Sequence, residues 1–377
     1  LQRAFQHSED IKVSNVFSSS YEKRVSICST NEWLQLDPTV THLTVNSNCL
    51  NELTALPLNR LITLKELVVG DTSLKGLSAV RLDGLSGLER VEIGSNSFKK
   101  SDSNSELVVR GCSVLRSVTL GSNSFASFGV MEIERVPLLE ELSVGDGCLK
   151  NVDALSLNGL SRLKQVVVGS SSFSNKNGAF SVVNCTSLES VEIGASSMGA
   201  YSVLSVDNTP SLEVLAIGSN TFKNVAALRL VGLSKLKKVE ISADSFTNKE
   251  GVFELKNCVS VSELVVGDNG MKLFGSVEVS GVPSLETIRV GSSVFKNVNE
   301  TRLVGLSKLK RVEVGEDSFT NKEGSFELTS CASVSELRVG NRSMSSFSSF
   351  EITTTPSLKT ITIGSDSFKN VDSFALS

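Results

Sequence analysis

Histidine and tryptophan are almost missing from this chain. Among 377 residues, His7 and His42 are the only histidines and Trp33 is the only tryptophan. This poverty argues against a histidine-based catalytic triad or a histidine-rich metal site. Tyrosine occurs only twice, and the formal net charge is −4. Mixed charge signs and the lack of an aromatic cluster argue against a nucleic-acid surface.

Long apolar runs are also missing. No stretch approaches the ~20 residues that a membrane-spanning helix needs, and the opening LQRAFQHSED lacks the basic-then-apolar pattern of a secretory signal. Hydrophobic residues make up 40% of the chain and charged residues 21%. Such values are typical of a folded, water-exposed protein rather than a disordered one.

What the chain does have is a repeat. The phrase VEIGSNSF at 91–98 returns as VTLGSNSF, VVVGSSSF, LAIGSNTF, VEVGEDSF and ITIGSDSF, with weaker copies between them. From Leu50 onward the last residue of the phrase recurs every 24 or 25 residues, with a single spacing of 27, which gives fourteen repeats. A fixed period of this length is typical of a solenoid.

Each copy fits the pattern LxxLxLxxNxL; the first places Val40, Leu43, Val45, Asn48 and Leu50 in it. This segment resembles the signature of the leucine-rich-repeat superfamily over residues 40–377. The spacing F/L-x-x-C/L-x-x-L is similar to that of the BspA-like (Treponema pallidum-type) branch, although the Ile-Pro dipeptide of that branch is missing.

The alternating apolar pair in the pattern predicts a short strand with one buried face. Asparagines after the strand are expected to bond backbone groups inside the turn, in a ladder that other residue types interrupt; they are Asn48, Asn96, Asn123, Asn220 and Asn269. A second alternating pair, such as Leu107 with Val109 or Phe326 with Leu328, predicts a strand on the opposite wall.

These patterns predict an all-β solenoid with little or no helix. We expect a parallel, concave sheet of about 14 short strands, with a second strand ladder on the opposite wall. No stretch between strands is long or periodic enough for a multi-turn helix.

A longer period lies over the repeat. Four cysteines (Cys112, Cys185, Cys258 and Cys331) are spaced by 73 residues, and residues 222–271 match 295–344 at 35 of 50 positions. The unit of duplication is therefore three repeats. Residues 1–39 do not fit the pattern and are expected to form an N-terminal cap, with apolar cover from Trp33 and Leu34. The array, 40–377, is expected to be truncated before a C-terminal cap.

The four cysteines occupy a slot that other repeats fill with Leu or Val, such as Leu233 and Leu306. We therefore expect buried apolar side chains there. Strands three repeats apart are separated by roughly 14 Å, beyond the ~7 Å that a disulfide allows. Cys28 and Cys49 are the one pair that could close, near the cap.

Other candidate sites have a plainer interpretation. The glycine after each strand lies in no phosphate-binding motif, and the acidic turns lack a calcium-repeat pattern. Sequons at Asn184, Asn299 and Asn341 are no excess over chance in a chain this rich in Asn and Ser. No cofactor or metal is expected.

The remaining candidate is the outward residue between the two buried strand positions. It varies freely along the array, which suits recognition of a macromolecule, although a solvated sheet face would look the same. The charged members of this row are the predicted ligand-binding residues: Glu92, Glu192, Glu240, Arg289, Glu313 and Arg338.

The sequence thus predicts a scaffold, not an enzyme, that recognises a protein or glycan. The resemblance to BspA-like proteins favours adhesion at a cell surface. The alternative is a structural rod or filament subunit that associates through its sides or ends.

Overall fold

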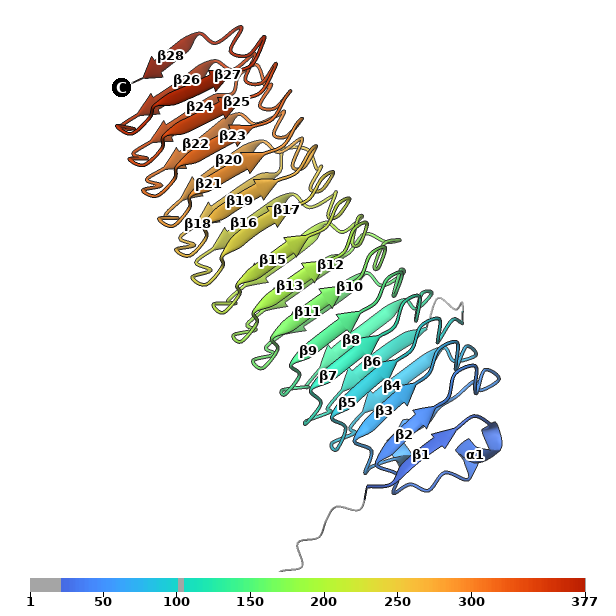
Figure 1. Ribbon diagram of the computed structural model, residues 1–377. Coiled ribbons are helices and arrows are strands. Elements are labelled where there is room, and N and C mark those ends of the chain that lie inside the picture. The colour runs from blue at the N-terminus through green and yellow to red at the C-terminus, as the bar shows by residue number, and fades with distance from the viewer. Residues whose placement is uncertain (1–21, 101–104, 377) are drawn as a thin grey trace, which may run out of the picture.

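The protein is an elongated β-solenoid, as Figure 1 shows. The computed structural model describes residues 22–100 and 105–376. Helix is confined in these residues to α1 (Thr30–Leu34) and the short 3-10 turn η1 (Leu58–Arg60). The predicted fold class, a strand-built solenoid with almost no helix, is confirmed.

One wall is a single parallel sheet, which we call the long sheet. It has fifteen strands rather than about fourteen, because the segment before the first repeat contributes β1. Its strands are β1 (Arg24–Ile27), β2 (His42–Val45), β3 (Glu66–Val69), β5 (Arg90–Ile93), β7 (Ser117–Leu120), β9 (Glu141–Val144), β11 (Gln165–Val168), β13 (Ser190–Ile193), β15 (Val214–Ile217), β17 (Lys238–Ile241), β19 (Glu263–Val266), β21 (Thr287–Val290), β23 (Arg311–Val314), β25 (Glu336–Val339) and β27 (Thr360–Ile363).

The opposite side, which we call the second wall, carries the predicted second ladder. It is divided into sheets of three, three and seven strands, with breaks between β8 and β10 and between β14 and β16. Its strands are β4 (Ala79–Asp83), β6 (Glu106–Arg110) and β8 (Val130–Glu134); β10 (Ala154–Asn158), β12 (Ala179–Val183) and β14 (Val203–Asp207); and β16 (Ala227–Val231), β18 (Val252–Lys256), β20 (Ser276–Ser280), β22 (Glu300–Val304), β24 (Ser325–Thr329), β26 (Ser349–Thr353) and β28 (Ser373–Leu376).

The core lies between the two walls. In the strands of the long sheet from β2 to β25 the second and fourth residues, such as Val91 and Ile93, point inward and are buried. Alternation with period two makes this possible, because successive side chains in a strand face opposite sides. Phenylalanines that end the repeated phrase stack along the axis; the rings of Phe98 and Phe125 have centroids 4.5 Å apart.

The turns after the long sheet are held by hydroxyl groups rather than by asparagines. Among the described residues, none of the five predicted asparagine side chains bonds a backbone group; Asn96, for example, adopts a left-handed φ of 60° and its amide oxygen accepts a hydrogen bond from Lys99. The next residue, Ser97, points inward instead. Its hydroxyl accepts from the backbone N–H of Ser73 and donates to the carbonyl of Gly70. The expectation that these asparagine side chains bond backbone groups is therefore wrong. Serine hydroxyls bond the backbone instead, and we call their series the serine ladder.

The predicted cap is described only from residue 22, and residues 1–21 lie outside the described part. Strand β1 pairs in parallel with β2, and Cys28 forms a disulfide with Cys49. Trp33 is buried, with the Arg60 guanidinium 4.1 Å from its ring centroid, whereas Leu34 is 66% exposed. Leu34 therefore does not cover the core.

The four regularly spaced cysteines are all fully buried and free, which confirms their interpretation as core residues. Burial raises the pKa of each of these thiols, and that of Cys112 reaches about 11. A thiol that stays protonated is a poor nucleophile and a poor metal ligand.

Candidate functional site

The candidate site is the outward surface of the long sheet. The third residue of each strand from β2 onward faces solvent, and we call this series the outward row. Strand pairing keeps the outward row in register along the whole sheet. At one end Thr44 lies opposite Val68, and at the other end Arg338 lies opposite Thr362. The outward row thus presents one side chain per strand at a regular spacing of ~4.8 Å.

The structure brings together only some of the six predicted residues. Arg289, Glu313 and Arg338 lie on adjacent strands, directly opposite one another in register. Glu240 is two strands before Arg289, and Glu192 is two strands before Glu240. Glu92 is isolated from the others, because the row between it and Glu192 is uncharged at Thr119, Ser143 and Val167.

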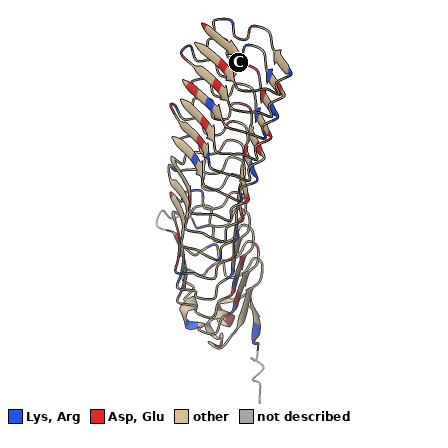
Figure 2. Ribbon diagram, turned by 90° about the vertical axis from the view of Figure 1, so that its left-hand side faces the viewer, with Lys and Arg blue, Asp and Glu red and all other residues tan. Residues whose placement is uncertain are grey.

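The charges toward the C-terminal end belong to a network of ion pairs. Arg289 contacts Glu263 and lies 3.4 Å from Glu313, and Arg338 lies 3.7 Å from Glu313. We call this group the charged network; its members are Lys238, Glu240, Glu263, Arg289, Arg311, Glu313, Glu336 and Arg338. With four acids and four bases it carries no net charge. Acidic and basic residues both occur on the strands toward the C-terminal end of the solenoid, as Figure 2 shows.

Half of this network was missed by the sequence reasoning. The first residue of each strand faces the same side as the third, so Lys238, Glu263, Arg311 and Glu336 form a second row beside the outward row. The signal was available, because residues i and i+2 of a strand share a face. Which acid meets which base depends on the register between repeats.

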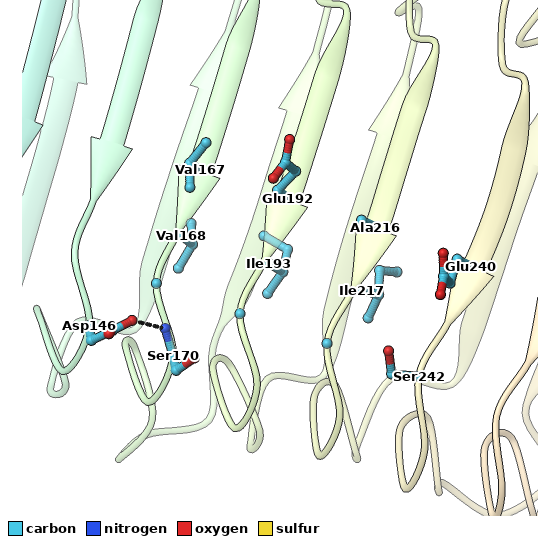
Figure 3. Close-up of a pocket in the computed structure, with 13 residues that line it drawn as sticks. Asp146, Val167, Val168, Ser170, Glu192, Ile193, Ala216, Ile217, Glu240 and Ser242 are labelled. Atoms are coloured by element: carbon cyan, nitrogen blue, oxygen red, sulfur yellow. Dashed lines mark hydrogen bonds between the residues drawn. The ribbon is translucent and has the colours of Figure 1, made fainter.

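A hollow of about 440 Å3 lies on the same surface, closer to the middle of the array. Val167, Glu192, Ala216 and Glu240, on four adjacent strands, cross it in a line, as Figure 3 shows. Asp146, Ser170 and Ser242 border it at the strand ends. Two of the six predicted residues therefore share one depression.

Small residues explain why this place is hollow. Ala216 offers only a methyl group between the longer side chains of Glu192 and Glu240. At the strand ends, Gly169, Gly194 and Gly218 line the depression. A Cβ on Gly169 would lie 2.5 Å from the backbone nitrogen of Asp146, so close stacking of successive turns demands glycine there.

The two carboxylates of the hollow have different partners. Glu240 pairs with Lys238 at 2.8 Å, and this carboxylate raises the pKa of the Lys238 ammonium. Glu192 accepts a hydrogen bond of 3.1 Å from the Ser190 hydroxyl and has no ion-pair partner among the described residues. Asp146 accepts from the backbone N–H of Ser170 at 2.6 Å. Glu192 and Asp146 therefore carry negative charges that no ion pair in the described residues compensates.

Within residues 22–100 and 105–376, no group of three or more His, Cys, Asp or Glu side chains is arranged to hold a metal ion. None of the helices in this part of the chain is long and apolar enough to cross a membrane.

Few known proteins resemble this chain in sequence or structure. Neither models of known protein families nor the sequences of curated proteins give a match. Among solved structures, the chain is similar to a leucine-rich repeat protein from Bacteroides ovatus, at 15% identity over 86% of this chain and 75% of that one. The TM-score is 0.21.

Proposed function

We propose that this chain is a non-enzymatic scaffold of the leucine-rich-repeat type, close to the BspA-like branch, that recognises a protein partner through the long sheet. The observation that carries the proposal is the hollow, in which Glu192 and Glu240 flank Ala216 on three adjacent strands. The occupant that fits it is a protein segment with an exposed lysine or arginine.

The dimensions suit a basic side chain. Two strand spacings place Glu192 and Glu240 roughly 10 Å apart, which leaves room for one chain between them. The aliphatic stem would lie on Ala216 and on Val214, whose exposed fraction is 41%. Lysine and arginine favour such places, because they bury an apolar stem and keep the charged end near water or a carboxylate.

The rigid ladder favours binding for an entropic reason. Side chains held on a hydrogen-bonded sheet lose little further freedom when a partner arrives. The charged network beside the hollow includes Arg289, Glu313 and Arg338 and would act mainly on specificity. Its acidic and basic side chains alternate, so a partner whose charges do not match this order would face like charges and be rejected.

A protein partner is favoured over a glycan by the side chains of the surface. The outward row and the row beside it contain no Phe, Tyr or Trp in the described residues, so none of these three rings is available to stack on a sugar. Catalysis by a thiol is disfavoured because the free cysteines are buried and burial raises their pKa values.

An extracellular or cell-surface location accords with this role. The Cys28–Cys49 disulfide favours an oxidising compartment, where such bonds form and persist. The resemblance to BspA-like proteins points the same way.

Selection of displayed random peptides on the immobilised chain tests the proposal. We expect enrichment of peptides with Lys or Arg, and loss of their binding in the double variant Glu192→Gln/Glu240→Gln. The matched control is Glu327→Gln/Glu351→Gln, which neutralises two adjacent carboxylates on the second wall and should leave binding unchanged. Equal losses in both variants would indicate nonspecific charge attraction.

The alternative, a rod or filament subunit, predicts a different outcome. If no peptide is enriched and the particle mass in sedimentation grows with protein concentration, the filament interpretation replaces the binding one.

A further inference from the structure

We propose that Asn299 is an N-glycan acceptor, independently of any ligand on the long sheet. Asn299, Glu300 and Thr301 form the sequence N-x-T that this modification requires. The structure adds two observations that the sequence cannot supply: the hydroxyl of Thr301 has no role in the fold, and the amide nitrogen of Asn299 is free to carry a sugar.

Thr301 stands where the repeats place a large apolar residue. In the second wall it lies between Val277 and Phe326 in register, and the residue 73 positions earlier is Leu228. Its exposed fraction is 1%, and its hydroxyl has no hydrogen-bond partner within the described residues. A buried hydroxyl without a partner costs stability, so the fold alone does not explain this threonine.

The core around Thr301 also shows that a larger apolar side chain is missing at this position. A cavity of about 20 Å3, lined by apolar side chains such as Phe295, Phe319 and Phe326, lies beside Thr301. The hydroxyl is the only side-chain polar group in its lining, whereas a buried water needs two or more partners. A leucine at this position, as in the earlier copy, would fill more of the space.

The difference from the earlier copy extends over the whole acceptor sequence. Residues 226–228 read Ala-Ala-Leu and residues 299–301 read Asn-Glu-Thr, while the flanking residues of the two copies are identical from 222 to 225 and from 229 to 237. Three neighbouring changes thus produce an acceptor sequence inside an otherwise unchanged segment. One of the three places a polar group in the core.

Asn299 is also presented in a suitable way. Its side chain is exposed directly before β22, while its backbone N–H donates to Gly275 and its carbonyl accepts from Ser325. Its amide oxygen accepts from Asn321, but its amide nitrogen donates to no residue in the described part of the chain. A sugar on this nitrogen therefore breaks no hydrogen bond.

The other two acceptor sequences differ in this respect. The amide nitrogen of Asn184 donates to Asn158 at 3.2 Å, and that of Asn341 donates to Glu316 at 3.1 Å. The hydroxyl of Ser343 belongs to the serine ladder and so has a structural reason to be present. Only Asn299 combines a free amide nitrogen with a hydroxyl that the fold does not use.

The reaction needs a lipid-linked oligosaccharide as the co-substrate. The amide nitrogen of Asn299 forms a bond to the anomeric carbon as the carbon–oxygen bond to the lipid pyrophosphate breaks. The nitrogen loses one proton, and the lipid pyrophosphate leaves. The transfer takes place before the chain is fully folded, when Thr301 is still accessible. The Cys28–Cys49 disulfide accords with passage through the compartment in which this happens.

The test is mass spectrometry of the full chain, purified from its natural source and from a eukaryotic secretion host. Digestion with a peptide glycosidase in heavy-oxygen water should convert Asn299 to labelled aspartate in both preparations. An unmodified Asn299 peptide from the natural source overturns the proposal. Recovery of label only at Asn184 or Asn341 overturns it as well.

Three variants separate the acceptor role from a structural one. Thr301→Ser should keep the glycan, whereas Thr301→Leu should remove it and, compared with enzymatically deglycosylated parent, raise Tm. Asn299→Gln should remove the glycan and melt like the deglycosylated parent. If Thr301→Leu lowers Tm, the threonine has a structural role and the argument from the core fails.

Discussion

The backbone N–H of Cys148 donates to the hydroxyl of Ser172 in the next repeat at 3.1 Å. The same hydroxyl donates to the carbonyl of Gly145 at 2.8 Å. One buried hydroxyl thus satisfies a donor and an acceptor of the preceding turn, and Ser73, Ser97 and Ser318 repeat the arrangement elsewhere. The serine ladder therefore fastens successive turns of the solenoid.

Removal of one hydroxyl tests this ladder. Ser172→Ala should lower the free energy of unfolding by about 1–3 kcal/mol, because a buried N–H and a buried carbonyl lose their partner. Denaturant titration followed by circular dichroism measures the change. Ser170→Ala is the control: its hydroxyl makes no hydrogen bond in the described structure, and its effect should stay within about 0.5 kcal/mol. Equal effects at 170 and 172 would contradict a structural ladder.

Cys258 tests the core on the second wall. Cys258→Val should cost less than about 1.5 kcal/mol, because a small apolar side chain still fills the buried slot. Cys258→Asp should destabilise the protein severely, since it buries a charge without a partner. Thermal melting of both variants distinguishes these outcomes. An aspartate variant that melts like the parent would place residue 258 at the surface and refute the register.

The walls and the core could be predicted from the sequence because their signal is local. Val91 and Ile93 alternate within one strand, and Cys258 shares its slot with Leu233 and Leu306. The pairings within the charged network and the hydrogen bonds of the serine ladder could not be predicted in the same way. Arg289 meets Glu263, 26 residues earlier, only because two strands pair in one register.

The exposed side of the molecule was also harder to predict for a physical reason. A buried position rejects polar residues, so its pattern is strict, whereas an exposed one tolerates both kinds. Leu34 is exposed although it is apolar, and the hollow depends on Ala216 being smaller than its neighbours on the row. Neither follows from a repeat pattern.

Ion pairs between repeats should make stability depend on pH in acid. Lys164 and then Arg116 lower the pKa of Glu140, which lies 2.9 Å from the Lys164 ammonium. A lowered pKa in the folded state means that the contribution is complete above the unfolded value of about 4.3. It is lost as pH falls through the lowered folded value. Tm should therefore decline as the solution is acidified below this range.

Glu140→Gln isolates that contribution. Its Tm should lie below that of the parent at neutral pH, and the two should converge in acid, where the parent carboxylate is protonated. High salt should shrink the difference at neutral pH, because exposed charges are screened. Glu189→Gln removes a carboxylate that has no ion pair in the described residues and should show no such convergence. A constant difference from neutral to acid pH would contradict the assignment.

The charged network supplies a test of where a protein partner binds. Reversal of Glu313 and Arg338 together retains their mutual attraction but sets like charges against Arg289 and Glu336. We expect weaker binding, seen mainly as a slower association rate in surface plasmon resonance, because complementary charges act on encounter and register. Folding should survive, since exposed ion pairs contribute only about 0–1 kcal/mol each.

The matched control is reversal of Lys308 and Lys322, two exposed lysines outside the long sheet. It changes the same number of charged side chains but shifts the net charge by four units, whereas the reversal of Glu313 and Arg338 leaves the net charge unchanged. A partner that binds the charged side chains of the long sheet should lose more affinity in the Glu313/Arg338 reversal than in the Lys308/Lys322 reversal. A partner attracted by the net charge of the protein should respond more to the Lys308/Lys322 reversal. Binding that survives both reversals would place the contact on the second wall or at the ends, and the filament interpretation would then be the stronger one.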